Sequence, residues 1–81
     1  MFKHKTSDGK RNICGEKIKN LRKNLPLKTS QRMVAEMMQL KGIDVDKSAI
    51  KCMENGSRYV TDIEIKALCS IFSVTADFLL E

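Results

Sequence analysis

Apolar residues recur every three or four positions over most of the chain, which is the spacing of amphipathic helices. The first such stretch runs from Asn12, a residue that can cap a helix, to the position before Pro26. Its apolar positions follow one another at intervals of four, three and four: Cys14, Ile18, Leu21 and Leu25. Because proline disfavours a helical conformation in the residue before it, we expect this helix to end near Asn24–Leu25.

Two further helices are predicted from their start and stop signals. Ser30 can cap a second helix that ends near Lys41-Gly42, with an apolar side made of Met33, Val34, Met37, Met38 and Leu40. Asp46 can cap a third, short helix that Gly56 ends, because helices often close on a residue with positive φ. Such a short helix is not stable alone in water, and its apolar edge consists of Ile50 and Met53.

The rest of the chain carries two more helix starts. Thr61 and Glu64 match a capping box, in which each side chain binds the backbone N–H of the other residue. The helix that follows has an apolar face of Ile65, Leu68, Cys69 and Phe72. Thr75 can cap a last short helix, and a hydrophobic staple is expected between Val74 and Leu79.

These patterns predict an all-α fold. We expect residues 1–11, which are polar and basic without periodicity, to form a flexible arm. Residues 12–81 are expected to form one compact domain of five helices, because a chain of 81 residues has no room for a second domain. With three phenylalanines, one tyrosine and no tryptophan, the core must be aliphatic, and the five methionines can serve as flexible filler.

The net charge of +5 is unevenly distributed along the chain. Residues 1–28 contain nine Lys or Arg against two acidic residues, whereas residues 29–81 contain six against eight. Such asymmetry favours a basic face or arm that binds nucleic acid or another anionic surface. A solvated lysine-rich tail would give the same composition, so charge alone leaves both interpretations open.

The reactive residue types predict neither a metal site nor a catalytic centre. Cys14, Cys52 and Cys69 are odd in number and lack a CxxC spacing, which favours free thiols in a reducing compartment. His4 is the only histidine and lies in the arm, so we expect no zinc site and no catalytic relay. With no apolar run of membrane-spanning length and no signal-peptide pattern, we expect a cytoplasmic protein without cofactor or small-molecule ligand.

Five short segments, taken in order, resemble the helix-turn-helix domains of the phage-repressor/Cro and xenobiotic-response-element-like family. They are Gly15-x-x-Ile18-x-x-Leu21-Arg22, Ser30-Gln31-x-x-Val34-Ala35-Glu36, Ser48-Ala49-Ile50, Met53-Glu54-Asn55-Gly56 and Ile71-Phe72-x-Val74-Thr75-x-Asp77-x-Leu79-Leu80. The resemblance covers residues 13–80 and implies a lambda-repressor-like helix-turn-helix domain. The chain departs from the family pattern in a longer first loop and in a longer segment between Gln31 and Glu54.

The resemblance also implies roles for individual residues. The helix over residues 47–55 would lie in the major groove, where bases would be read by Lys47, Ser48 and Lys51. Lysine suits this role because it can donate to the O6 and N7 acceptors of guanine. Contacts to the DNA backbone are implied for Gln31, Asn55, Arg58, Arg22 and Lys23. The family pattern further implies a structural ion pair of Arg22 with Glu54, an acid that would be unfavourable near DNA without a partner.

We therefore expect a sequence-specific, repressor-like regulator of transcription that binds double-stranded DNA. It would act as a homodimer on an inverted repeat, with an interface built from exposed apolar residues of the last helix, Leu79 or Leu80. The alternative is a protein-interaction module on the same scaffold, such as an antitoxin or a phage control factor. An enzyme is not expected, because the chain lacks a nucleophile–base set, a metal cluster and a phosphate-binding loop.

Overall fold

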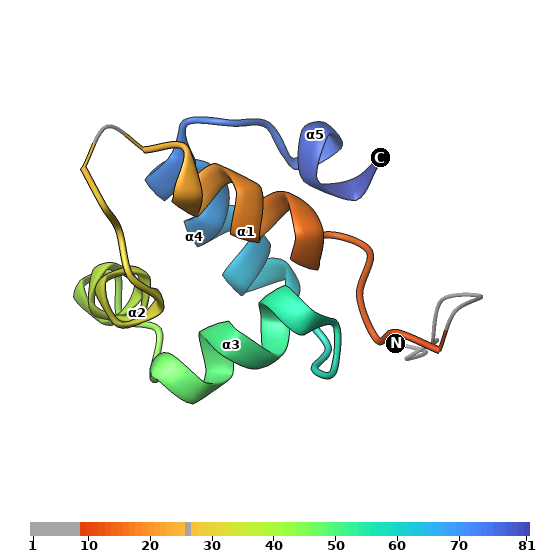
Figure 1. Cartoon of the computed structure of the whole chain (residues 1–81), viewed down its shortest axis with the longest axis horizontal. Coiled ribbons are helices and arrows are strands. Elements are labelled where there is room, and N and C mark those ends of the chain that lie inside the picture. The colour runs from red at the N-terminus through yellow and green to blue at the C-terminus, as the bar shows by residue number, and fades with distance from the viewer. Residues whose placement is uncertain (1–8, 26) are drawn as a thin grey trace.

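The chain folds into helices joined by short loops (Figure 1). The computed structural model describes residues 9–25 and 27–81, and within them it contains five α-helices and no strand. The helices are α1 (Gly15–Lys23), α2 (Gln31–Leu40), α3 (Lys47–Asn55), α4 (Asp62–Phe72) and α5 (Ala76–Leu80). The expected all-α fold is confirmed. The radius of gyration is 11.8 Å, close to the value of about 12 Å for a compact chain of this length.

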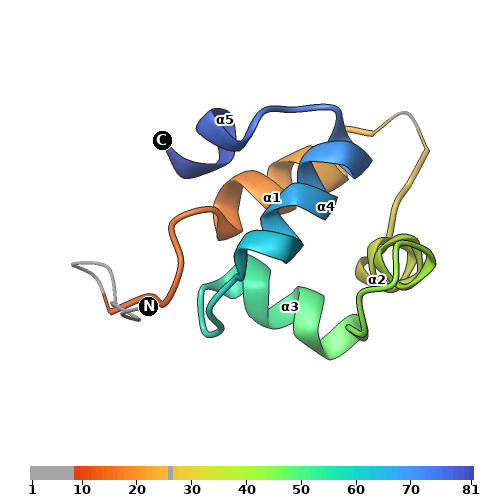
Figure 2. The same ribbon diagram turned by 180° about the vertical axis from the view of Figure 1, so that it is seen from behind.

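The helices pack around α1, α3 and α4. In Figure 1, α1 lies in front of α4 with α3 below it, and Figure 2 shows the same elements from behind, with α4 in front. α1 contacts α3 and α4, α2 contacts the same two helices, and α5 contacts α4. The short helix α3, which cannot be stable alone, is therefore held by α1 and α2.

Helix starts agree with the sequence prediction except at α1. The predicted caps of the other four helices each accept a hydrogen bond from a backbone N–H of the first turn: Ser30, Asp46, Thr61 and Thr75. α1 begins at Gly15, with Cys14 rather than Asn12 at the N-cap. Asn12 still accepts a hydrogen bond from the Gly15 N–H, and its amide donates to the carbonyl oxygens of Met53 and Arg58. Asn12 thus joins the start of α1 to the end of α3.

The core is aliphatic, as the composition predicts. Every helix contributes side chains that are 0% exposed: Ile18, Val34, Met38, Ile50, Met53, Leu68 and Leu79. The sequence prediction that Leu79 could be an exposed interface residue is therefore wrong. The exposed apolar residues of α5 are its neighbours Phe78 and Leu80.

The apolar side predicted for α2 is too wide. Met33 is 39% exposed and Leu40 is 88% exposed, although both were expected on the apolar side. The buried residues of this helix are Val34, Ala35 and Met38. α2 contacts α3 and α4 through this buried side, and Leu40 in its last turn reaches solvent.

Across residues 9–25 and 27–81, every helix is too short or too polar to cross a bilayer.

Candidate nucleic-acid interface

The candidate site is centred on α3, whose two ends are fixed locally. Asp46 accepts a hydrogen bond from the backbone N–H of Ala49 at 2.9 Å, and Gly56 ends the helix with a φ of +80°. Ile50 and Met53 are completely buried and hold one side of the helix against the core. The opposite side of α3 is therefore presented to solvent in a fixed orientation.

The exposed side of α3 carries three of the residues that the sequence singles out. Lys47, Lys51 and Asn55 are four residues apart and all exposed, so they form one stripe along the helix. Ser48 is also exposed, beside Lys47 in the first turn. Asn55 Oδ1 accepts a hydrogen bond from the Ser57 N–H at 2.9 Å, which directs its amide NH2 group away from the turn.

Beneath this stripe, Glu54 joins three helices. Arg22 Nε lies 2.7 Å from Glu54 Oε2, and Arg22 Nη2 lies 3.0 Å from Glu54 Oε1. Gln31, the first residue of α2, donates to Glu54 Oε1 at 3.0 Å. The ion pair expected between Arg22 and Glu54 is thus present, and its hydrogen bond raises the pKa of Arg22 above the ordinary value.

The position of Arg22 differs from that of a surface arginine. Its side chain is 13% exposed, and its third bonded nitrogen, Nη1, donates to the Thr29 carbonyl oxygen at 3.0 Å. Arg22 therefore joins α1 to α3 and to the loop before α2. Its neighbour Lys23 is exposed and lines a shallow hollow beside Lys28 and Ser30, at the start of α2.

Arg58 has a partner that the sequence did not predict. Its Nη1 atom lies 3.0 Å from both carboxylate oxygens of Glu64, a residue that is 5% exposed. Glu64 Oε1 also accepts a hydrogen bond from the Thr61 N–H at 2.9 Å, within the predicted capping box. Arg58 and Glu64 are six positions apart in the sequence. This spacing predicts an ion pair only if the loop after α3 is known to fold back onto α4.

The segment before α1 is attached to the end of α3. The Arg11 N–H donates to the Gly56 carbonyl oxygen at 2.7 Å, and its guanidinium donates to the Ser57 carbonyl oxygen at 3.1 Å. The guanidinium also lies 5.9 Å from the centroid of the Tyr59 ring. Lys10, whose side chain lies beside Gly56, and Arg11 therefore pack on the end of α3, and residues 1–8 of the predicted arm lie outside the described part of the chain.

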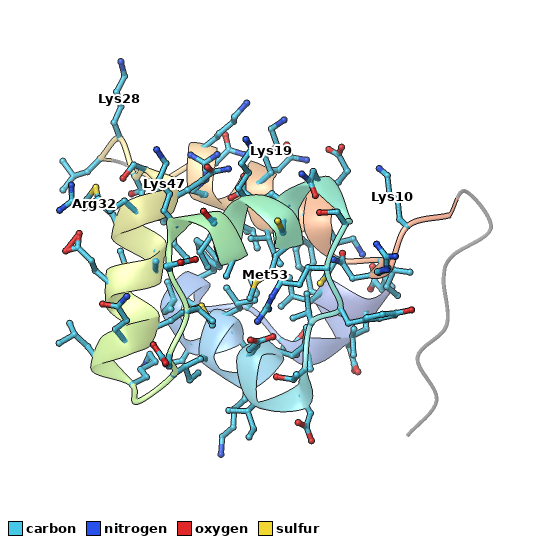
Figure 3. All side chains as sticks on the ribbon, turned by 90° about the horizontal axis from the view of Figure 1, so that it is seen from below. Lys10, Lys19, Lys28, Arg32, Lys47 and Met53 are labelled. Atoms are coloured by element: carbon cyan, nitrogen blue, oxygen red, sulfur yellow. The ribbon has the colours of Figure 1, made fainter. Side chains whose placement is uncertain are left out.

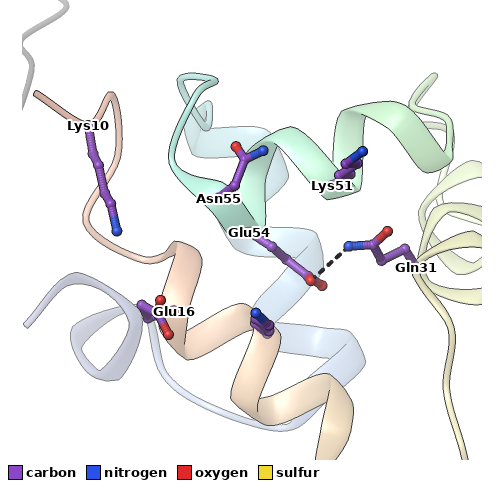
Figure 4. A pocket seen from close by; sticks show the side chains of 7 residues that line it. Lys10, Glu16, Gln31, Lys51, Glu54 and Asn55 are labelled. Atoms are coloured by element: carbon purple, nitrogen blue, oxygen red, sulfur yellow. Dashed lines mark hydrogen bonds between the residues drawn. The ribbon is translucent and has the colours of Figure 1, made fainter.

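A basic hollow borders the exposed stripe of α3. It encloses about 370 Å³ between α1, α3 and the start of α2, and its lining residues are Lys10, Glu16, Lys19, Gln31, Lys51, Glu54 and Asn55. Figure 4 shows Lys10, Lys51 and Asn55 around this hollow, with the Gln31–Glu54 hydrogen bond at its base. Arg22 is paired with Glu54, so the other charged residues that line the hollow are three lysines, Lys10, Lys19 and Lys51, and one acid, Glu16.

Lys10 and Lys19 extend the candidate site beyond the residues that sequence reasoning named. In Figure 3, Lys10, Lys19, Lys28 and Lys47 all project from the same side of the molecule, and α4 lies on the opposite side. The charge excess of residues 1–28 suggested a basic surface without saying which lysines share a face. Only the packing of α1 on α3 brings Lys10 and Lys19 next to Lys51.

The chain was also compared with known proteins. No protein-family model matches it, and neither a curated protein nor a solved structure matches it significantly. The family resemblance of the sequence remains a prediction.

Proposed function

We propose that this protein binds double-stranded DNA sequence-specifically, as a repressor-like regulator, with α3 in the major groove. In this proposal α2 and α3 are the two helices of a lambda-repressor-like helix-turn-helix. The observation that carries it is the exposed stripe of Lys47, Lys51 and Asn55 on a helix that is capped and anchored from below. An α-helix fits the major groove, and a rigid helix can present its side chains to base edges in a fixed register.

The residues then divide into two groups. Lys47, Ser48 and Lys51 are the proposed base-reading residues. Phosphate contacts are assigned to exposed or partly exposed polar residues on the same side of the molecule: Lys19, Lys23, Lys28, Gln31 and Asn55. Arg22 and Arg58 support the site indirectly in this proposal, because their guanidinium groups bind Glu54 and Glu64. Phosphate contacts of this kind fix orientation, and base contacts supply sequence preference.

The proposal is tested by the salt dependence of DNA binding in two charge-matched variants. Each phosphate neutralised by a lysine contributes about −0.9 to the slope of log K against log salt on B-DNA. The double variant Lys19→Gln, Lys23→Gln removes two of the proposed phosphate contacts and should therefore reduce the slope by up to about 2. The variant Lys41→Gln, Lys66→Gln removes the same charge from residues that line a hollow beside α4, and it should leave the slope unchanged.

Two results would contradict DNA binding through this face. One is binding of random duplex that does not weaken as salt increases. The other is an equal loss of slope in both double variants, which would indicate a general charge effect without a defined surface. Fluorescence anisotropy with a labelled duplex at several salt concentrations measures both quantities.

We further propose that two copies bind an inverted repeat. Supporting this, α5 carries Phe78 and Leu80, which are 40% and 50% exposed, and Ile13 before α1 is 52% exposed. Exposed apolar residues of this size can form a contact between copies. Leu79 takes no part in this contact, because it is completely buried.

A further inference from the structure

A second surface of the molecule has a different character from the basic face. It is a groove of about 340 Å³ between the segment that follows α2 and the side of α4. One wall is a stripe of four α4 residues spaced three or four positions apart: Ile63, Lys66, Ala67 and Ser70. The facing wall is formed by Lys41 and Ile43, which follow α2.

The floor of this groove is apolar and one apolar side chain stands open at its edge. Ala67 is 6% exposed and Ile43 packs partly buried against the core, so both present apolar surface from below. Ile63 is 66% exposed, although it lies inside a helix that buries most of its other apolar residues. Leu40, the residue before Lys41, is 88% exposed. A concave apolar surface buries more of a partner side chain than a flat patch does, and so binds it more favourably.

The charged residues that line the groove are both basic. Lys41 Nζ donates to Ser70 Oγ at 3.0 Å, which holds the lysine across the end of the groove. The other lysine, Lys66, is exposed on α4. Among the described residues, neither lysine forms an ion pair with a carboxylate, and no acidic residue lines the groove. Its edges therefore attract negative charge.

The groove and the proposed DNA-binding face are on different sides of the molecule. Lys10, Lys19, Lys28 and Lys47 project from one side in Figure 3, whereas α4 forms the other side. α2 extends from one to the other, with Arg32 near its first turn on the lysine side. A partner in the groove would therefore leave α3 accessible.

We propose that this groove binds a short segment of another protein, in which aliphatic side chains are flanked by Asp or Glu. The stripe on α4 spans residues 63–70, about 10 Å of helix, which accommodates two side chains one helical turn apart. The volume is near the lower end of ligand-binding pockets, about 300 Å³, so it suits side chains better than an entire cofactor. The acidic flanks would pair with Lys41 and Lys66, while the aliphatic residues would cover Ile63 and Ala67.

The test uses a displayed library of random short peptides, selected on the full chain without DNA. Selected peptides should combine Leu, Ile or Phe with nearby Asp or Glu. Ile63→Ser should weaken a selected, labelled peptide by about tenfold or more, the loss expected when one well-packed apolar anchor is removed. The matched control is Ile13→Ser, which removes another exposed isoleucine, 52% exposed, and should leave peptide affinity unchanged.

A charge exchange tests the second half of the proposal. The double variant Lys41→Glu, Lys66→Glu should no longer bind the acid-flanked peptide. It should instead bind the same peptide with lysines in place of its acidic residues. Thermal melting of each variant establishes that it is folded, which is expected because these side chains are exposed or half-exposed. Amide chemical-shift changes upon peptide addition should concentrate at residues 41–43 and 63–70.

Four outcomes would overturn the inference. They are selection of no peptide, selection of base-rich peptides, shift changes outside the groove, and a self-association that Ile63→Ser abolishes, which would make the groove a contact between copies. Each is independent of the DNA proposal, since the measurements contain no DNA and the variants leave the basic hollow unchanged.

Discussion

At the scale of single residues, Glu54 is the side chain on which the candidate site most depends. It is 5% exposed, and it accepts hydrogen bonds from Arg22 and Gln31. A buried carboxylate is costly to desolvate, and its partners compensate for that cost only as long as all of them remain in place. Replacing one member should therefore be more harmful than the number of lost hydrogen bonds suggests.

Glu54→Ala should lower the free energy of unfolding by about 3–5 kcal/mol, because it leaves the Arg22 guanidinium buried without its carboxylate. Urea denaturation followed by circular dichroism measures this loss. Glu36→Ala is the matched control: its pair with Arg32 spans 3.7 Å, and both side chains are more than half exposed. That change should alter stability by about 0.5 kcal/mol or less. Similar losses for both variants would show that the Arg22–Glu54 pair has no special weight.

Lys47 and Lys23 should differ in the kind of DNA affinity they support. Lys47→Ala should weaken binding to the preferred duplex by about 1–3 kcal/mol and leave unrelated duplexes nearly unaffected, as expected for a base contact. Lys23→Ala should weaken every duplex to a similar, smaller extent, as expected for a phosphate contact. The preferred duplex would come from selection on random DNA. Uniform losses in both variants would remove Lys47 from base reading.

Cys14 should be the least reactive of the three thiols. It is 1% exposed, and burial raises its pKa above the ordinary value of 9.0. Since the thiolate is the reactive form, iodoacetamide should modify Cys14 more slowly than the partly exposed Cys52 and Cys69, and unfolding in urea should abolish the difference. Modification of Cys14 at the rate of the other two would contradict this burial.

The raised pKa of Cys14 also has a consequence for stability at alkaline pH. The unfolded chain releases this thiol proton at a lower pH than the folded chain does. The stabilisation is therefore fully present below the unfolded pKa and is lost as pH rises through the folded pKa. Unfolding free energies measured below and above pH 9.0 should show a fall that Cys14→Ala reduces.

At the scale of the helices, features that depend on neighbouring residues were predicted better than contacts between distant residues. Ser30, Asp46 and Thr75 act as caps because a cap needs only a side-chain oxygen and the next turn of backbone. The ion pair of Arg58 with Glu64 escaped prediction because it depends on how the loop after α3 meets α4. Helical periodicity likewise identified apolar residues of α2 but could not say how much of that side its neighbours cover.

Gly15 lies where α1 approaches the backbone of α3 closely enough to exclude a side chain. A Cβ atom there would overlap the carbonyl oxygen of Met53 and lie 2.8 Å from that of Glu54. Helix propensity alone predicts that Gly15→Ala stabilises the domain by about 1 kcal/mol. We expect the opposite, a loss of about 1–3 kcal/mol, because α1 would have to move away from α3. Thermal melting beside Asn20→Ala, an exposed position on the same helix, distinguishes the two results.

At the scale of the whole molecule, the basic hollow and the exposed apolar residues of α5 belong to different elements. Lys10, Lys19 and Lys51 gather where α1 meets α3, and the exposed Phe78 and Leu80 lie on α5. Periodicity predicted the all-helical domain, and composition showed an excess of basic residues in the first 28 positions that fits either a basic surface or a solvated tail. The sequence could not indicate which residue of α5 points outward, because that depends on the docking of α5 against α4.

Leu80→Ser should separate the two proposed levels of DNA binding. We expect cooperative binding to an inverted repeat to be lost, because the contact between copies is removed. Affinity for a single half-site should change by less than about twofold, because the surface of α3 is unchanged. Ile63→Ser is the control, as it removes an exposed apolar side chain from α4. Electrophoretic mobility shifts on one and two half-sites give both affinities. Unchanged cooperativity would exclude Leu80 from the contact between copies.

The hydrogen-bonded group of Glu54, Arg22 and Gln31 also constrains how this sequence can change over evolutionary time. Loss of Arg22 alone would leave a buried carboxylate uncompensated, whereas simultaneous replacement of such a pair by well-packed apolar residues is often tolerated. Positions 22 and 54 should therefore covary among descendants of this chain, with position 31 following less strictly because its amide is neutral. A lineage in which one charge is lost and the other is kept should be rare or should show a new partner nearby.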